Sequence, residues 1–360
     1  MNRRNFLHFS CISTMSMVLL GESIVYADNT MGTTYVLTME FDLSVQKGDQ
    51  CSLWVPLPNT IEGFQRVIDT TYTLSDGKGE EFYFKTLGAR YYFVKWNSSE
   101  RIRRLKIEIS VAVQDRTASF YPINHTRVID KDVREFLLPT AHVPHDPYID
   151  KVTRRVIGNT QAPLEKARKI YDWIVHNTYR DENIRGCGIG YPVEMIKQFG
   201  SSGKMGGKCF DISSLCVAMM RSAGIPAREV VGLRVGASRL SNAFGTGENV
   251  TSAQHCKVEF FIEGLGWIPC DPADISKLVL KENLSIDSER VKELSGKFFG
   301  FWEKNWIALN YARDFDLFPA NAQGKLDQFN YPYGEIDGEY IESYDPKNFR
   351  YSFHSAVQGI

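Results

Sequence analysis

A cysteine, a histidine and an aspartate follow one another along the chain in an order that suits thiol chemistry. Cys209 directly precedes a stretch with helical periodicity, His255 opens an apolar run, and Asp271 closes the next apolar run. The first turn of a helix lowers the pKa of a thiol and offers N–H groups to a developing oxyanion. A histidine can take the thiol proton, and a carboxylate can orient the imidazole. We therefore expect Cys209, His255 and Asp271 to act as nucleophile, base and orienting group.

The surrounding pattern predicts the elements that must position these side chains. Apolar residues recur at helical spacing after the cysteine, at Ile212, Leu215, Cys216 and Met219. This spacing predicts a helix with one buried stripe, ended by Gly224 and Pro226. The runs 255–262 and 267–270 predict two strands of a hairpin with a turn at 263–266.

The register of this hairpin decides which side chains meet. If His255 lies opposite Asp271, the carboxylate can reach the imidazole. The same register would place Cys256 opposite Cys270, where a disulfide could form. The sequence alone leaves the register open.

Each candidate residue also has a structural interpretation. A cysteine at a helix start is often a small buried hydrophobe, and an aspartate before proline is a common turn residue. Asp211 is expected to support the helix N-terminus by its charge. Tyr179 could assist an oxyanion hole or simply pack in the core. His142 and His145 flank a proline, which favours a loop over a metal site.

The stretch from about 162 to 274 resembles the transglutaminase-like core. The matching motifs are Ile170-Tyr171-Asp172-Trp173-Ile174, Gly207-Lys208-Cys209-Phe210-Asp211, Gly224-Ile225-Pro226-Ala227-Arg228, His255 with Val258-Glu259, and Gly266-Trp267-Ile268-Pro269 followed by Asp271-Pro272. The resemblance implies a papain-like fold and carries the catalytic triad onto Cys209, His255 and Asp271. It names no substrate, because the family includes peptidases, amidases, cross-linking acyltransferases and members without activity.

One departure from the family pattern stands next to the histidine. Many members carry Ala-Trp there, whereas this chain has Cys256-Lys257. That form, together with the loop Gly186-Cys187-Gly188, resembles an uncharacterised exported bacterial branch.

The first residues predict export. Residues 1–27 combine a short basic region, an apolar stretch and the small residues of a signal-peptidase site. Arg3-Arg4 also fits a twin-arginine signal, and a plain secretory signal is the alternative. No later apolar run is long enough to span a bilayer. We therefore expect a periplasmic or secreted protein without stable membrane insertion after signal removal.

The remaining chain is predicted to be α+β. Alternating residues predict a β-sandwich-like domain at 33–118, followed by the transglutaminase-like catalytic core at 149–275. An aromatic C-terminal extension at 276–360 is expected to pack on the core. Of the cysteines that follow the predicted export signal, Cys216 is expected to lie in the core, and Cys187 could form a disulfide with Cys209.

Composition narrows the function. The chain has 360 residues and a formal net charge of −1, and no basic block suggests nucleic acid. We expect a peptide or protein substrate, no cofactor and no metal. The predicted function is an exported thiol acyl-transfer enzyme that hydrolyses peptides or amides through a thioester. The alternatives are a cross-linking acyltransferase and a catalytically silent periplasmic binding or assembly protein.

Overall fold

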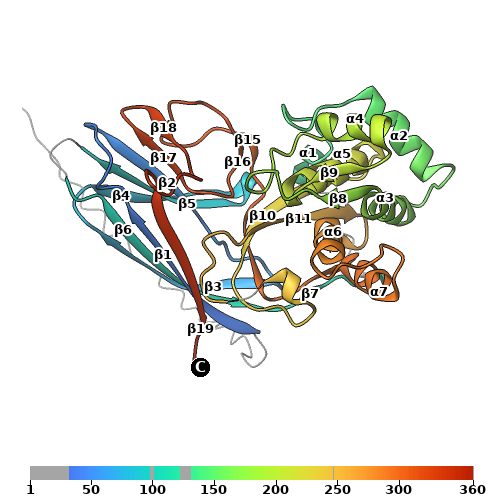
Figure 1. Cartoon of the computed structure of the whole chain (residues 1–360), viewed down its shortest axis with the longest axis horizontal. Helices are drawn as coiled ribbons and strands as arrows, with labels where there is room; N and C mark the ends of the chain where they lie inside the picture. Colours follow the sequence, from blue (N-terminus) through green and yellow to red (C-terminus); the bar gives the residue numbers. More distant parts are fainter. Residues whose placement is uncertain (1–31, 98–100, 122–130, 246, 360) are drawn as a thin grey trace, which may run out of the picture. The chain divides into compact units, whose positions relative to one another are not determined.

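A computed structural model describes residues 32–97, 101–121, 131–245 and 247–359 (Figure 1). The predicted export signal at 1–27 lies outside the described residues. Among the described residues, none of the helices combines the length and apolar character needed to cross a membrane.

The strands and helices alternate along the chain in blocks. The strands are β1 (Thr33–Asp42), β2 (Cys51–Leu57), β3 (Gln65–Leu74), β4 (Lys78–Phe84), β5 (Ala89–Trp96), β6 (Arg104–Val113), β7 (Arg116–Thr117), β8 (Thr178–Arg180), β9 (Met205–Gly207), β10 (Ala227–Arg234), β11 (Gln254–Ile262), β12 (Gly266–Cys270), β13 (Phe301–Trp302), β14 (Trp306–Asn310), β15 (Arg313–Phe315), β16 (Leu326–Gln328), β17 (Tyr333–Ile336), β18 (Glu339–Ile341) and β19 (Arg350–Val357). The helices are α1 (Lys131–Glu135), α2 (Pro147–Ile157), α3 (Pro163–Asn177), α4 (Pro192–Ser202), α5 (Cys209–Ser222), α6 (Pro272–Lys281) and α7 (Glu289–Phe298). Proline opens α2, α3, α4 and α6, where its missing N–H costs no helical hydrogen bond.

Two antiparallel sheets contain the strands predicted for 33–118. Their strand orders are β19-β1-β6-β3 and β18-β17-β2-β5-β4. Leu37, Met39 and Phe41 of β1 are buried while their neighbours are less so, as the two-residue period of a half-buried strand requires.

The C-terminal strands complete these sheets. β19 pairs with β1, and β17 pairs with β2, so strands from 333–357 lie beside strands from the start of the described chain (Figure 1). β14 instead pairs with β10 in the core sheet. The region after 276 therefore packs on the core only in part. The boundaries of the four predicted regions stay predictions.

A third sheet and a central helix form the core around the candidate site. The sheet has the order β12-β11-β10-β14, and α5 packs on β10 and β11. Helices α2, α3 and α4 contact α5 as well. Every residue from Cys209 to Met220 is buried, so the single predicted stripe was too narrow. The fold is the expected α+β class with a transglutaminase-like core.

The hairpin β11–β12 forms as predicted but in another register. Cys270 lies opposite Val258, and not opposite Cys256. The shift is two residues, which keeps each side chain on its original face of the sheet. Cys256 and Cys270 are free thiols, so the disulfide suggested by the other register is wrong.

Candidate functional site

Cys209 is the first residue of α5 and is held there by its neighbours. Asp211 accepts hydrogen bonds from the N–H of Lys208 at 3.0 Å and from the N–H of Gly190 at 2.9 Å. The N–H of Phe210 donates to the carbonyl of Cys187 at 2.9 Å. These bonds fix the start of α5 against the loop that carries Cys187. Asp211 thus ties the helix N-terminus to that loop by hydrogen bonds as well as by charge.

His255 and Asp271 are in direct contact with each other. Nε2 of His255 lies 2.8 Å from Oδ2 of Asp271, and both side chains are buried. Oδ1 of Asp271 accepts the N–H of Asp274 at 3.0 Å, because Asp271 is the N-cap of α6. The capping bond orients the carboxylate toward the imidazole. The His255 imidazole is close enough to the Cys209 thiol to lower the pKa of that thiol by hydrogen bonding and by charge.

Two further charged residues, Lys257 and Asp274, join this centre, although neither was predicted from the sequence to have a role in it. The Lys257 ammonium donates to Oδ2 of Asp271 at 2.6 Å, and it is buried. Oδ1 of Asp274 lies 3.4 Å from Nε2 of His255 and 2.5 Å from the Arg234 guanidinium. The departure Cys256-Lys257 was the available signal for Lys257, since residues two apart on a strand share a face.

The charges of the centre shift two pKa values. Burial alone would raise the pKa of Asp271, but Lys257 and His255 hold it well below the usual range. Hydrogen bonds from Cys187 and Cys256 lower the pKa of Cys209 most. The hydrogen bond and charge of His255 add to this, so the pKa lies well below that of an ordinary thiol despite burial.

Two further thiols, those of Cys187 and Cys256, flank the predicted nucleophile Cys209. The sulfur atoms of Cys187, Cys209 and Cys256 all lie within 4.8 Å of one another. Asn330 donates to both Cys187 and Cys256, and the Tyr331 hydroxyl donates to Cys187 at 3.1 Å. Cys216 is buried in the core, as predicted, and forms a hydrogen bond with Cys270.

Two groups of side chains have the donor types of metal sites. Three thiols are a donor set that soft ions prefer. His255, Asp271 and Asp274 form the other group, but there the Lys257 ammonium already occupies Oδ2 of Asp271. Neither arrangement assigns a metal to the protein.

The remaining candidates from the sequence fall outside the centre or at its edge. Tyr179 is 49% exposed, so the core-packing alternative is wrong; it lies opposite Gly206 in the β8–β9 pair. His142 bonds to Asp314, while His145 lies 3.0 Å from Asp150. These histidines therefore serve two different carboxylates.

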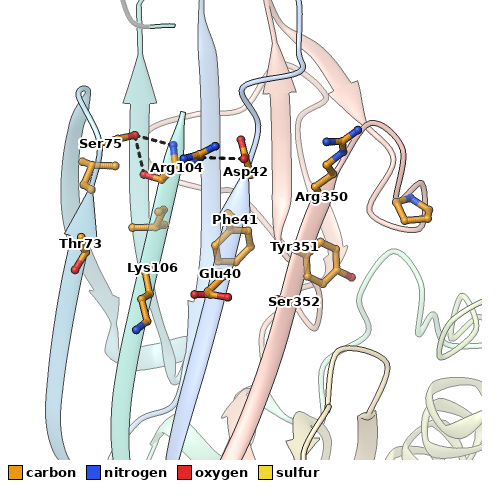
Figure 2. Close-up of a pocket in the computed structure, with 13 residues that line it drawn as sticks. Glu40, Phe41, Asp42, Thr73, Ser75, Arg104, Lys106, Arg350, Tyr351 and Ser352 are labelled. Atoms are coloured by element: carbon orange, nitrogen blue, oxygen red, sulfur yellow. Dashed lines mark hydrogen bonds and ion pairs between the residues drawn. The ribbon is translucent and has the colours of Figure 1, made fainter. Parts of the chain in front are cut away.

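A large cavity lies away from these residues, on the sheet β19-β1-β6-β3. Its volume is about 680 Å3, and Figure 2 shows Arg104 bonded to Asp42 and Ser75 at its edge. The lining residues are Glu40, Phe41, Asp42, Thr73, Leu74, Ser75, Arg104, Leu105, Lys106, Pro346, Arg350, Tyr351 and Ser352. They include no cysteine or histidine, so this cavity adds nothing to the thiol chemistry.

Comparison with known proteins places the fold and the site in a family. The family model of the transglutaminase-like superfamily matches residues 150–272, which include Cys209, His255 and Asp271. An uncharacterised protein of Haemophilus influenzae is 37% identical over 348 residues, covering 91% of this chain and 92% of that protein. The chain belongs to the transglutaminase-like superfamily.

A solved structure is similar over nearly the whole length. It is described as a candidate cysteine protease from Cytophaga hutchinsonii and matches with a TM-score of 0.51 at 17% identity. The match covers 91% of this chain and 99% of that chain. At this identity the likeness concerns the fold, including the strand-rich regions that flank the core.

Proposed function

We propose that the protein is an exported cysteine hydrolase that cleaves peptide or amide bonds through a thioester on Cys209. The observation that supports this most directly is the bonded pair His255–Asp271 beside a thiol of lowered pKa. Nε2 of His255 is engaged by the carboxylate, which leaves Nδ1 to exchange a proton with the thiol. This geometry supports the proposed roles of Cys209 as nucleophile, His255 as proton carrier and Asp271 as the group that orients His255.

The proposed reaction has two stages. The Cys209 thiolate attacks the carbonyl carbon, and the imidazolium of His255 protonates the departing amine or ammonia as the C–N bond breaks. Water then attacks the thioester, His255 accepts its proton, and Cys209 leaves as the thiolate. The N–H of Phe210 is already bonded to Cys187, so the oxyanion would use the N–H of Cys209 and the Tyr179 hydroxyl instead.

Hydrolysis is proposed over amine transfer because water would be the abundant acceptor outside the cytoplasm. Periplasmic or secreted localisation rests on the sequence of residues 1–27. A peptide or protein substrate is part of this proposal, because a thiolate can attack the carbonyl carbon of an amide bond.

The test is a panel of peptide and carboxamide substrates with and without a primary amine. The protein is expected to release ammonia or a new amine, and Cys209→Ala and His255→Ala should abolish this release. Cys216→Ala is the matched control, because that thiol is buried in the core and should be dispensable. Dominant conjugation to the added amine would establish an acyltransferase. A Cys209→Ala protein with wild-type function in the cell would instead indicate a binding protein.

A further inference from the structure

A second cavity lies at the C-terminal half of α6. Its volume is about 700 Å3, and it is lined by Ser238, Arg239, Leu240, Ser241, Asn242, Ala243, Lys277, Lys281, Glu282 and Arg290. Four of these side chains are cationic and one is anionic. An anionic occupant would be favoured only where these cations are not already paired with carboxylates.

One face of α6 connects this cavity with the candidate catalytic centre. Asp274, Lys277 and Lys281 have the spacing i, i+3 and i+7, which places them along one side of the helix. Asp274 lies 3.4 Å from His255, and Lys277 and Lys281 line the cavity. The cavity therefore begins one helical turn beyond a residue that contacts His255.

Most cations around the cavity already have carboxylate partners. Arg290 bonds to Glu282 at 2.7 Å, Lys281 to Glu182 at 2.5 Å, and Arg239 to Asp115 at 2.6 Å. Among the described residues, Lys277 is therefore the one cation of the lining without a carboxylate partner.

Lys277 differs from these residues. Within the described part of the chain, its ammonium has neither a hydrogen bond nor an ion pair, although the side chain is only partly exposed. Burial, followed by the charges of Arg234 and Arg180, lowers the pKa of Lys277 to about 8. The charge of the Cys209 thiolate acts in the opposite direction.

Arg180 lies on β8, which contacts α6, and is not among the residues that line the cavity. It lies opposite Gly207 in the β8–β9 pair, two residues before Cys209. Its Nε is buried and has no hydrogen-bond partner, and among the described residues its guanidinium forms no ion pair. Unpaired buried donors are costly, and a ligand that accepts their hydrogen bonds would remove that cost.

We propose that Lys277 and Arg180 form an anion subsite beside Cys209 that binds a carboxylate of the acyl donor. The substrate is then an acidic peptide, whose carboxylate belongs either to an Asp or Glu side chain or to a free C-terminus. This inference rests on the proposed function, because it assigns a substrate class to the same thiol. Arginine and lysine supply complementary carboxylate contacts, one as a planar fork and one as a compact charge.

The experiment measures alkylation of Cys209, which requires no knowledge of the natural substrate. Iodoacetate and iodoacetamide each transfer a two-carbon group to a thiolate and release iodide, but only iodoacetate carries a carboxylate. The ratio of their rate constants, iodoacetate over iodoacetamide, is determined by peptide mapping of Cys209. The Lys277→Met and Arg180→Gln variants should each lower this ratio by about three- to tenfold.

Lys197→Met is the matched control, because Lys197 is an exposed lysine paired with Glu194 on α4. Its ratio should equal that of the wild type. Lys277→Met removes a partly buried charge that has no partner, so its melting temperature should not fall, and the ratio can be compared in folded protein.

A second measurement separates the two sources of the carboxylate. Acetyl-Gly-Glu-Gly-amide, acetyl-Gly-Gly-Gly with a free C-terminus and acetyl-Gly-Gly-Gly-amide are compared as protectants of Cys209 against iodoacetamide. Protection by the first or the second above the neutral peptide, lost in Lys277→Met, supports the subsite and identifies the source. An unchanged alkylation ratio in both variants overturns the subsite while leaving the nucleophile intact. Absence of labelling by either reagent in the folded protein would overturn the proposed function itself.

Discussion

Lys257 donates a hydrogen bond of 2.6 Å to the same carboxylate oxygen of Asp271 that contacts His255. The hairpin register explains the contact. Cys270 lies opposite Val258, and because the strands are antiparallel, Asp271, which follows Cys270, comes level with Lys257, which precedes Val258. His255 is two residues from Lys257 and therefore on the same face. One buried carboxylate thus serves a lysine and the predicted catalytic histidine together.

We expect Lys257→Met to destabilise the protein strongly. Removing one partner of a buried ion pair leaves the other charge without compensation, which costs about 3–5 kcal/mol. The free energy of unfolding in urea measures this cost. Adding Asp271→Asn should recover part of it, because the uncompensated charge is then gone while the capping oxygen remains.

The control for this prediction is Lys197→Met, which breaks an exposed ion pair with Glu194. Surface pairs contribute little, so its unfolding curve should match the wild type. A Lys257→Met protein as stable as Lys197→Met would show that the bond to Asp271 contributes no net stability.

The thiol pKa predicts how labelling depends on pH. The pKa of Cys209 is lowered, so its thiolate persists as the pH falls below the range of an ordinary thiol and is protonated only near the lowered value. Iodoacetamide should therefore label Cys209 well below pH 8. Cys187→Ala and Cys256→Ala should each move the rate profile to higher pH, because each removes a hydrogen bond to the Cys209 sulfur.

Cys187→Ser is the conservative comparison, since its hydroxyl can still donate toward Cys209. Its profile should lie closer to the wild type than that of Cys187→Ala. A wild-type profile with its midpoint near 8.5, the value for an unperturbed thiol, would contradict the lowered pKa.

How far the sequence could predict this centre is clearest in the hairpin. Residue pattern placed the two strands and their turn correctly, because alternation and glycine are local signals. It could not fix the register, since every shift by two residues preserves the faces. His255 and Asp271 still reach each other after a shift of two residues, whereas Cys256 and Cys270 are then too far out of line to form a disulfide. Long side chains reach a diagonal neighbour, but a disulfide needs closely opposed positions.

The remaining differences arise from contacts distant in sequence. β19 pairs with β1 across more than 300 positions, and no local pattern of the 276–360 region indicates that partner. Arg234, Lys257 and Asp274 are likewise brought together from three elements. Cys187 lies beside Cys209 because the loop bonds of Asp211 hold it there, and these bonds depend on tertiary structure.

Mild oxidation should join thiols within the three-cysteine group. The sulfur atoms of Cys187, Cys209 and Cys256 are within 4.8 Å, so a small side-chain movement allows a bond of about 2.05 Å. Diamide accepts the two electrons and two protons that disulfide formation releases. We expect it to abolish iodoacetamide labelling of Cys209 and dithiothreitol to restore it.

Peptide mapping without reductant identifies the bond. The expected link joins Cys209 to Cys187 or Cys256, and the double variant Cys187→Ser/Cys256→Ser should keep Cys209 reactive. A major product linking Cys256 to Cys270 would contradict the observed register, in which these residues are not opposed.

The last prediction concerns the loop that positions Cys187. Gly188 has a φ of 91°, and a Cβ there would lie 1.9 Å from the Asp211 carboxylate. Gly203, at the end of α4, has a φ of 72° but no atom within 4 Å of such a Cβ. Gly203→Ala should therefore cost only the conformational strain, about 1–2 kcal/mol. Gly188→Ala should cost more, because the carboxylate must also move and its bond to Gly190 is weakened.

The same pair of variants tests whether this loop tunes the thiol. Displacement of Cys187 in Gly188→Ala should weaken its hydrogen bond to Cys209 and move the pH profile of Cys209 labelling upward. Gly203→Ala should leave that profile unchanged, because its helix end is exposed and the substituted position meets no neighbouring atom. Equal unfolding free energies for the two variants, with identical labelling profiles, would show that the contact between Gly188 and Asp211 does not position Cys187.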